Sequence, residues 1–205
     1  MRETEHTTLE RIHAAAGEEF LQHGFIQASL RRIVRRAGVT TGAFYGYYNS
    51  KEALFEALVG EHYQYFMNCF KKAQEDFARL PRERQPEELE SISGDCMTEM
   101  LRYAYRHLDA FKLLLFCSEG TRFSGMVDEM VEIETKSTYK YQEVLNGLGR
   151  PSPGIDPRLE HILITGMFNA FFELIIHEMP LCQAERYLAE MRMFYTAGWM
   201  KLMGQ

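Results

Sequence analysis

Residues 29–51 read SLRRIVRRAGVTTGAFYGYYNSK, and this stretch decides the fold that we expect for the N-terminal region. Its first part predicts an amphipathic helix, because Ile33, Val34 and Ala37 share one face with Leu30. Ser29 stands where a serine side chain can cap the start of that helix. The opposite face carries Arg31, Arg32, Arg35 and Arg36. The pattern therefore predicts a short helix with an apolar inner face and a cationic outer face.

A tight turn and a second short helix are expected next. Gly38 can adopt the positive φ that ends a helix, and Val39 can plug the corner. Thr40 can cap a helix that begins at Thr41. Two short helices around a three-residue turn predict a helix-turn-helix, a motif whose second helix enters the major groove of DNA.

The second helix of this motif has a nearly bare outer surface. Phe44 and Tyr48 lie four residues apart and can pack inward, which leaves Gly42 and Gly46 on the opposite side. The residues that flank these glycines are Ala43, Tyr45 and Tyr47. An outer surface of this kind allows the backbone to come close to a ligand as large as a DNA duplex.

The same region is cationic. Residues 25–51 contain five basic residues and no acidic one. Lys51 lies in the first turn of the next predicted helix, where the helix dipole disfavours a cation, so a nearby phosphate explains it better than helix stability does. The alternative is a solvated basic helix in an ordinary helical protein. The coincidence of turn, caps, charge and outward tyrosines favours DNA binding.

The combined pattern resembles the DNA-binding domain of the TetR family of transcriptional regulators. The matching residues read IHAAAGEEFLQHGF at 12–25 and S-x-x-x-I-V-x-x-A-G-V-T-x-G-x-x-Y-x-Y-Y-x-S-K-E-x-L-F at 29–55, about a quarter of the chain. The resemblance implies an all-helical homodimer whose N-terminal three-helix domain binds operator DNA. It also implies a larger C-terminal domain that binds a small effector, usually with release of the DNA.

The resemblance also assigns DNA contacts to individual residues. The residues expected to contact phosphates are Ser29, Tyr45, Tyr47 and Lys51. Those expected to approach bases are Arg31, Thr41, Ala43 and the backbone at Gly42. Thr40 is also among the expected DNA-binding residues. Glycines at positions 42 and 46 leave few direct hydrogen bonds to bases. Part of the sequence specificity should therefore come from DNA shape and from methyl contacts.

We expect an all-α chain of about nine helices in two domains. Residues 1–50 are the expected helix-turn-helix domain, and residues 51–205 the expected effector-binding and dimerisation domain. A long helix over about residues 51–80 links them. The other helices are expected over about residues 7–23, 87–107, 110–120, 126–149, 157–178 and 181–203.

Charge and cysteine usage exclude several classes of protein. The net charge is −6, yet residues 1–60 contain seven basic and seven acidic residues. A local cationic surface fits this distribution better than a general polyanion binder or a membrane-surface protein does. The four cysteines form no C-x-x-C pair, so we expect no disulfide framework, metal or cofactor. No signal core and no run of about 18 apolar residues occurs, which predicts a soluble, cytoplasmic protein.

The penultimate helix is the expected wall of a ligand pocket. Between Ile162 and Ile176, 11 of 15 residues are apolar, which indicates neighbours on two sides. Thr165, Asn169 and Glu173 interrupt this run every four residues and share a sector of about 80°. They either anchor an apolar or aromatic effector in a cavity, or face solvent or the dimer two-fold. The pocket candidates are Tyr103, Phe111, Phe116, Tyr139, Thr165, Phe168, Asn169, Phe172 and Glu173.

The last two helices are the expected dimer interface, because the resemblance implies a four-helix contact between two subunits there. Small residues would permit a close approach of the helices. The candidates are Gly166, Ala170, Met191, Phe194 and Gly198.

The function expected from these features is ligand-responsive repression, in which a homodimer on a palindromic operator is released by a mainly apolar effector. The alternatives are a transcriptional activator, an effector-independent DNA binder and an enzyme with a helical apolar pocket. The sequence lacks a G-x-S-x-G elbow, a glycine-rich phosphate loop and an H-E-x-x-H motif, so no catalytic residue is proposed.

Overall fold

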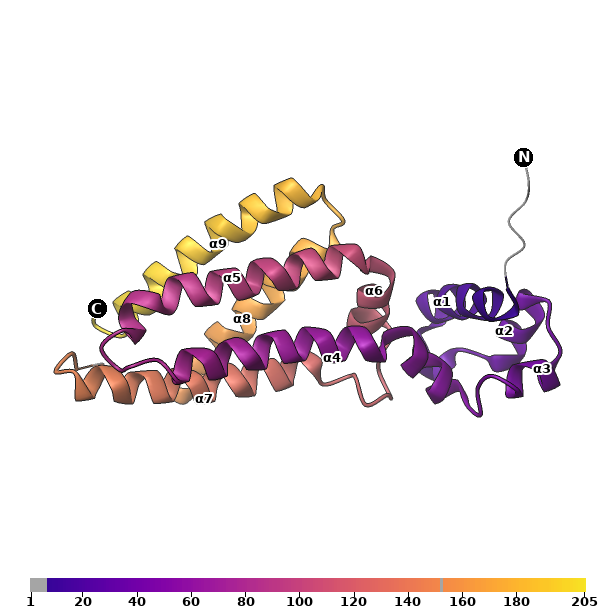
Figure 1. The fold of residues 1–205 in the computed structure, drawn as a ribbon, viewed down its shortest axis with the longest axis horizontal. Helices are drawn as coiled ribbons and strands as arrows, with labels where there is room; N and C mark the ends of the chain where they lie inside the picture. The colour runs from indigo at the N-terminus through magenta and orange to yellow at the C-terminus, as the bar shows by residue number, and fades with distance from the viewer. Residues whose placement is uncertain (1–6, 152) are drawn as a thin grey trace. The chain divides into compact units, whose positions relative to one another are not determined.

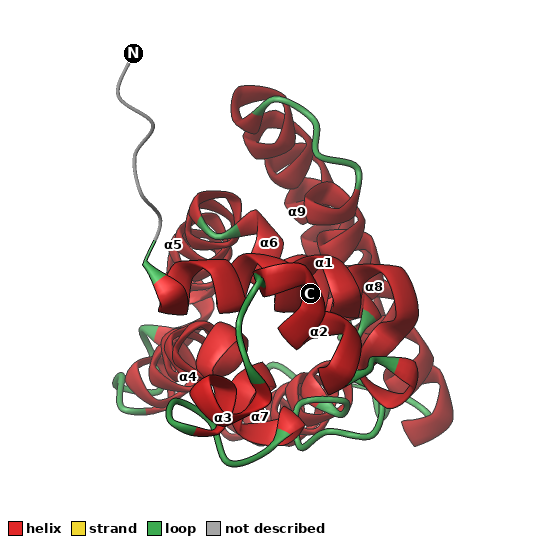
Figure 2. Ribbon diagram, turned by 90° about the vertical axis from the view of Figure 1, so that its right-hand side faces the viewer, coloured by secondary structure: helices red, strands yellow, loops and turns green. Residues whose placement is uncertain are grey.

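The computed structural model describes residues 7–151 and 153–205. These residues form helices and loops, with no strand among them (Figures 1 and 2). The helices are α1 (Thr8–Gln27), α2 (Leu30–Ala37), α3 (Thr41–Tyr45), α4 (Lys51–Ala78), α5 (Gln85–Arg106), α6 (Leu108–Phe116), α7 (Met126–Gly147), α8 (Pro157–Ile176) and α9 (Leu181–Leu202). The predicted all-α class is confirmed.

The chain packs into two compact units. The first contains residues up to Tyr65 together with His107–Ser124, and the second contains Phe66–Arg106 and Gly125–Gln205. The packing units therefore divide α4 between Tyr65 and Phe66 and place α6 with the N-terminal helices. The expected boundary between a DNA-binding domain (residues 1–50) and an effector-binding domain (residues 51–205) stays a prediction. Helix α4 is continuous and contributes residues to both packing units.

The core of the first unit is a cluster of phenylalanines. Phe20 and Phe55 meet edge to face with ring centroids 5.0 Å apart, and Phe25 meets Phe55 at 5.3 Å. All three side chains are buried. Gly24 interrupts α1 with φ 67° and ψ 168°, a positive φ that glycine adopts without the steric cost of a side chain. The break turns Phe25 into the core.

The helix-turn-helix forms largely as predicted. Gly38 ends α2 in the left-handed region (φ 64°, ψ 36°), and the Thr40 side chain caps α3 by accepting a hydrogen bond from the Ala43 N–H. The capping role expected for Ser29 is wrong, because its side chain makes no capping hydrogen bond. The carboxylate of Glu19 on α1 accepts from the Ser29 N–H at 2.9 Å instead.

Glu19 joins α1 to α2 inside the first unit. Its side chain is buried and forms an ion pair of 2.6 Å with Arg32. Burial alone would raise the pKa of Glu19, but the hydrogen bonds from Arg32 and Ser29 and the charges of Arg32 and His23 outweigh it and lower the pKa. The carboxylate is therefore ionised at neutral pH and fixes the start of α2.

The second unit is a helical bundle in which α7 packs on α8, α5 packs on α9, and α8 packs on α9. Polar contacts cross these interfaces: the Tyr105 hydroxyl on α5 donates to the Leu174 carbonyl on α8, and Arg102 on α5 pairs with Glu185 on α9. Seven residues of α8 are buried. By length and composition α8 could also cross a membrane, and 39% of its apolar window is buried within the protein.

Lys51, at the start of α4, binds the end of α1. Its ammonium donates to the carbonyl oxygens of Phe25 at 2.6 Å and of Ile26 and Ala28 at 3.2 Å each. It also lies 4.5 Å from the centroid of the Phe25 ring. An ammonium group has three donors. Three carbonyls therefore satisfy it, and this arrangement explains why a cation occupies the first turn of a helix.

Replacement of Lys51 by alanine should destabilise the first unit by about 1–3 kcal/mol, because partly buried carbonyls lose a charged donor. Hydrogen exchange of amides in residues 8–37 should accelerate accordingly. Lys72→Ala is the control, since Lys72 is exposed and pairs with Asp76 on its own helix. Unchanged protection in Lys51→Ala would show that the three hydrogen bonds contribute nothing to folding.

Candidate DNA interface and candidate ligand pocket

The exposed surface of α3 and of the turn that follows it carries two tyrosines. Tyr45 and Tyr47 are 55% and 49% exposed. Gly42 on α3 and Gly46 at its C-terminal cap are also exposed, while Phe44 is fully buried against the first unit's core. The predicted inward packing of Tyr48 is also observed, because Tyr48 is half-buried and its hydroxyl hydrogen-bonds with the His13 ring at 2.5 Å. The exposed residues of α3 are those expected to face DNA.

The four arginines of α2 divide into two pairs. Arg32 binds Glu19 at 2.6 Å and Arg36 binds Glu18 at 2.9 Å, both on α1. Arg31 and Arg35 are exposed and form no ion pair with the described part of the chain. Arg31 is therefore the predicted base-contacting arginine that stays available to an external anion. Arg32 and Arg36 already have partners in the fold.

The geometry gives Lys51 a different role from the expected phosphate contact. Its three donors are directed at carbonyls of the same unit, so a phosphate would have to compete with them. The phosphate assignment for Lys51 stays a prediction, as do those for the other proposed DNA contacts. The remaining candidates all lie at or near the exposed surface: Ser29, Arg31, Thr40, Thr41, Gly42, Ala43, Tyr45 and Tyr47.

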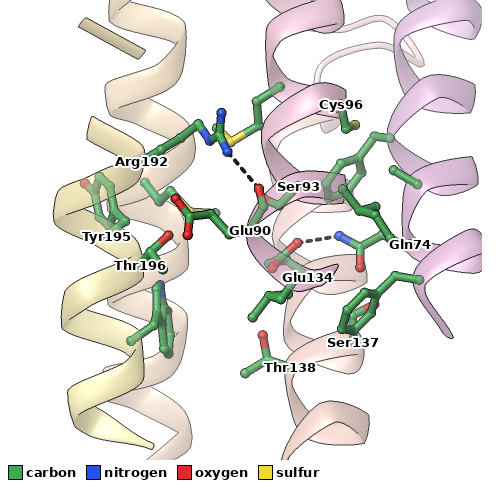
Figure 3. A pocket seen from close by; sticks show the side chains of 18 of the residues that line it. Gln74, Glu90, Ser93, Cys96, Glu134, Ser137, Thr138, Arg192, Tyr195 and Thr196 are labelled. Carbon is green, nitrogen blue, oxygen red and sulfur yellow. Dashed lines mark hydrogen bonds between the residues drawn. The ribbon is translucent and has the colours of Figure 1, made fainter. Parts of the chain in front are cut away.

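The second unit contains a cavity of about 150 Å³ (Figure 3). Side chains from α4, α5, α7, α8 and α9 surround it, all of them within this unit. Most of the wall is apolar, and its larger members include Phe70, Met100, Met130, Phe168, Phe171 and Trp199. A mainly apolar cavity with a few polar groups is the usual form of a small-molecule site.

Glu134 on α7 supplies a carboxyl group to this cavity. The Gln74 amide on α4 donates to its Oε2 atom at 2.6 Å, the contact drawn in Figure 3. Removal from water raises the pKa of Glu134 to about 7, and the hydrogen bond from Gln74 offsets only part of that effect. The carboxyl therefore changes charge near neutral pH.

Tyr141 lies two turns further along α7 and also lines the cavity. It is 4% exposed, and its hydroxyl has no hydrogen-bond partner among the described residues. Its ring meets Phe77 on α4 edge to face at 5.6 Å. Thr138 lies between Glu134 and Tyr141 on the same wall. Because these three residues follow at intervals of four and three, one face of α7 carries the polar part of this wall.

Arg192 on α9 closes the cavity against α5. Its guanidinium donates to the Glu90 carbonyl at 2.7 Å (Figure 3). It lies where a side chain at position 94 would stand, because a Cβ added to Gly94 would come within 1.6 Å of Arg192 Nη2. The absence of a side chain at Gly94 thus leaves a notch on α5, and the Arg192 guanidinium occupies it.

The polar stripe predicted on α8 does not reach the cavity. Asn169 and Glu173 are exposed, and Glu173 pairs with His177 at 3.0 Å on the outside of the helix. The Thr165 hydroxyl is buried without a partner but does not line the cavity. The alternative interpretation, in which the stripe faces solvent or a second subunit, fits these positions. The pocket-facing interpretation does not.

Most of the aromatic pocket candidates also lie elsewhere. Of these only Phe168 lines the cavity. Phe172 and Tyr103 are buried outside its wall, and Phe111 is buried in the first unit. Tyr139 is 61% exposed and Phe116 is likewise exposed. The helix face could not be chosen from aromatic content, because aromatic residues serve both as core and as pocket wall.

The residues that the sequence reasoning missed are those on α7. Glu134, Thr138 and Tyr141 have helical spacing, but polar residues on an amphipathic helix ordinarily mark its solvent face. The spacing of the apolar residues indicates which face of α7 is buried. Met130 and Leu145 share a face with Thr138 and Tyr141, and all four are buried. A polar group within the apolar stripe is more informative than one that interrupts an apolar helix.

The cysteines occupy separate environments. All four are free, with Cys117 buried and Cys182 exposed. Cys96 lines the cavity, and its hydrogen bond with Cys69 together with burial raises the pKa of its thiol. The thiol is therefore protonated at neutral pH. In the described ranges no group of three or more His, Cys, Asp or Glu side chains is arranged to hold a metal ion.

Comparison with known proteins supports the interpretation of the first unit. Residues 7–58 match the family model described as bacterial regulatory proteins, tetR family. The HTH-type transcriptional repressor NemR of Escherichia coli is 26% identical over 168 residues, which cover 82% of this chain and 73% of NemR.

Solved structures support the fold of the whole chain. A transcriptional regulator of Aquifex aeolicus superposes with a TM-score of 0.54 at 23% identity, covering 90% of this chain and 96% of the other. The TetR-family regulator PfmR of Thermus thermophilus gives 0.56 at 17% identity and 98% coverage of both chains. At these identities the superpositions establish the fold and not the ligand.

The raised pKa of Glu134 predicts a loss of stability as the pH rises. The folded protein holds this proton more tightly than the unfolded chain, whose ordinary value is 4.5. The contribution of this proton to the stability of the folded protein is complete below about pH 4.5 and is lost as the pH rises through 7.

Glu134→Gln should remove the part of the fall in unfolding free energy that comes from ionisation of Glu134. Between pH 5 and pH 8, the wild type should lose up to about 3 kcal/mol of unfolding free energy more than the variant does. Urea titrations followed by fluorescence of Trp199 measure this difference in the second unit. Glu132→Gln on the exposed side of α7 serves as the control. Parallel pH profiles for wild type and Glu134→Gln would contradict the assignment.

Proposed function

Because this chain belongs to the tetR family of bacterial regulatory proteins, we propose that it is a cytoplasmic repressor that binds a palindromic operator as a homodimer and releases it when a small effector binds. One observation carries the proposal. The chain combines a helix-turn-helix whose exposed surface is cationic and aromatic with a second helical unit that contains a cavity of its own. The family assignment supports the DNA-binding half, and the cavity supports the effector-binding half.

The first unit is proposed to bind DNA with α3 in the major groove. Tyr45 and Tyr47 offer hydroxyl groups to phosphates, and Arg31 is free to reach a base edge. The glycines of α3 let the backbone approach the groove closely. One such helix buries too little surface for tight specific binding, and a palindrome read by two copies meets that requirement.

Dimerisation is proposed through α8 and α9. Each leaves an apolar stripe exposed: Ile162 and Gly166 on α8, and Met193, Phe194 and Gly198 on α9. Phe194, inside α9, is 74% exposed and its neighbour Met193 is 70% exposed. Adjacent exposed apolar side chains of this size are typical of an interaction surface. Of the other proposed contacts, Ala170 is half-buried, whereas Met191 lines the cavity.

Helix α4 is proposed to carry the signal. Its Phe70, Gln74 and Phe77 line the cavity, and its Lys51 binds the end of α1. An effector that binds one setting of α4 more tightly than another would change the population of the DNA-binding state. An effector with equal affinity for both settings would change nothing. Activation of transcription by the same DNA contact is the alternative outcome.

Substitutions on α2 and α3 test the DNA surface. Against an operator selected from a random duplex pool, Arg31→Ala should weaken binding about tenfold and reduce the preference over a scrambled duplex, because it removes a base contact. Tyr45→Ala should weaken binding to both duplexes alike. Arg79→Ala, at an exposed position directly after α4 and paired with Glu75, is the control. Wild-type affinity in both test variants would rule out this surface.

Gly166→Leu tests the dimer. A Cβ at Gly166 meets no atom within 4 Å in the monomer, so the larger side chain fits the isolated subunit. At a close helix crossing between subunits it should cost about 1–3 kcal/mol and raise the dimer dissociation constant roughly 5- to 150-fold. Sedimentation velocity over a concentration series measures this change, with Gly17→Leu on α1 as a second open-space control. Normal dimerisation of Gly166→Leu would place the interface elsewhere.

A further inference from the structure

The polar wall of the cavity shows what kind of effector it fits. Glu134, Thr138 and Tyr141 present three oxygen-bearing groups from one face of α7. The Tyr141 hydroxyl is buried and has no hydrogen-bond partner among the described residues. Buried hydroxyl groups in folded proteins are nearly always hydrogen-bonded. Because Tyr141 lines the cavity, its unpartnered hydroxyl is a candidate to accept an N–H from a ligand.

The charges around Glu134 are not balanced by the protein. The neutral Gln74 amide is its hydrogen-bond partner, and no described ion pair includes its carboxyl group. The other titratable groups on the wall are Glu90 and Cys96 from α5, Tyr141 from α7, and Arg192 and Tyr195 from α9, whereas α4 and α8 contribute none. Arg192 already donates to the Glu90 carbonyl. A cation supplied by the ligand would therefore be the counter-ion of Glu134.

The aromatic wall favours a cation as well. Tyr141 and Phe77 meet edge to face at 5.6 Å, and Phe70 and Phe168 do so at 5.5 Å. Trp199 also lines the cavity. Faces of aromatic rings attract ammonium groups, and the attraction increases where water is excluded. An anionic ligand would instead meet the carboxyl groups of Glu90 and Glu134, against the single guanidinium of Arg192 on the wall.

The size of the cavity limits the ligand. An apolar cavity of about 150 Å³ accepts one benzene-sized ring, and the cavity here has about that volume. A primary ammonium group carries three N–H donors, and α7 lines the cavity with four oxygen-bearing side chains, those of Glu134, Ser137, Thr138 and Tyr141. The apolar remainder of the wall matches a single ring or a short alkyl chain.

We propose that the effector is a compact lipophilic primary amine whose ammonium group binds the Glu134 carboxylate and the Tyr141 hydroxyl, with its ring or alkyl body against the aromatic wall. The proposal rests on the function proposed above and names the chemical class that the same cavity takes. Glu134 supplies the charge complement. Tyr141 supplies a second oxygen acceptor, and Gln74 holds the carboxyl group in place.

Three ligands of equal size and different charge test this class: benzylamine, benzyl alcohol and benzoate. Trp199 is the sole tryptophan of the chain and lines the cavity, so its fluorescence reports occupancy directly. Titrations in phosphate buffer at pH 7.5, repeated by calorimetry, give the dissociation constants. Benzylamine should bind at least tenfold more tightly than benzyl alcohol, and benzoate should bind most weakly.

Matched variants on α7 identify the contacts. Glu134→Gln should weaken benzylamine at least tenfold and change benzyl alcohol less than about twofold, whereas the exposed Glu132→Gln should change neither. Tyr141→Phe should weaken benzylamine about fivefold, whereas Tyr139→Phe, on the exposed side of the helix, should not. Tyr141→Phe removes the hydroxyl and keeps the buried ring, so the fold should be preserved. It is a second test of the contact beside Glu134→Gln.

The pH dependence of binding gives a further readout. Burial raises the pKa of Glu134 to about 7, so below that pH the ammonium must displace a proton. Benzylamine affinity should therefore fall toward tenfold per pH unit below pH 7 and level off above it. Glu134→Gln should abolish this dependence while Trp199 still reports binding of benzyl alcohol.

Several outcomes would overturn the proposal. Equal or tighter binding of benzyl alcohol or benzoate would exclude an amine, and no binding of any of the three at millimolar concentration would exclude the class and size together. Release of DNA by a different ligand that quenches Trp199 would support the regulatory function and overturn the amine. Benzylamine binding that depends on Glu134 but leaves DNA affinity unchanged would support the ligand class and overturn its role as effector.

Discussion

The end of α1 creates a requirement that the start of α4 must meet. Because α1 ends at Gln27, the carbonyls of Phe25, Ile26 and Ala28 need donors from outside the helix. Lys51 provides all three. The residue that begins the long helix is thereby joined to the residues that precede the helix-turn-helix. The position of α2 and α3 on the first unit depends on this contact and on the buried Glu19 carboxylate.

Local features of the sequence predicted the helix-turn-helix well. The left-handed Gly38, the Thr40 cap and the buried Phe44 each depend on residues within one or two helical turns, and all three are observed. The failures concern contacts between distant residues. Ser29 was expected to cap its own helix, but Glu19, ten residues earlier, binds its N–H. Lys51 was assigned to a phosphate because its partners lie more than twenty residues away in the sequence.

The pocket was predicted less well for a related reason. A helix that contacts several neighbours has more than one buried face, and periodicity alone does not say which neighbour encloses a cavity. The polar residues of α8 interrupt an apolar run, yet Asn169 and Glu173 point outward. The polar residues of α7 looked ordinary for an amphipathic helix, yet Glu134 and Tyr141 line the cavity. Buried polar groups that lack full compensation carry a cost in stability, and the protein retains two of them on one wall.

The notch at Gly94 has a consequence for sequence variation. The guanidinium of Arg192 occupies the space that any side chain at position 94 would need. An alanine there would expel the arginine from its contact with the Glu90 carbonyl and move the only cationic side chain of the described cavity wall. Positions 94 and 192 are therefore expected to coevolve: in related chains that carry a bulkier residue at 94, the long basic residue at 192 should be lost as well, and the charge of the pocket should change with it.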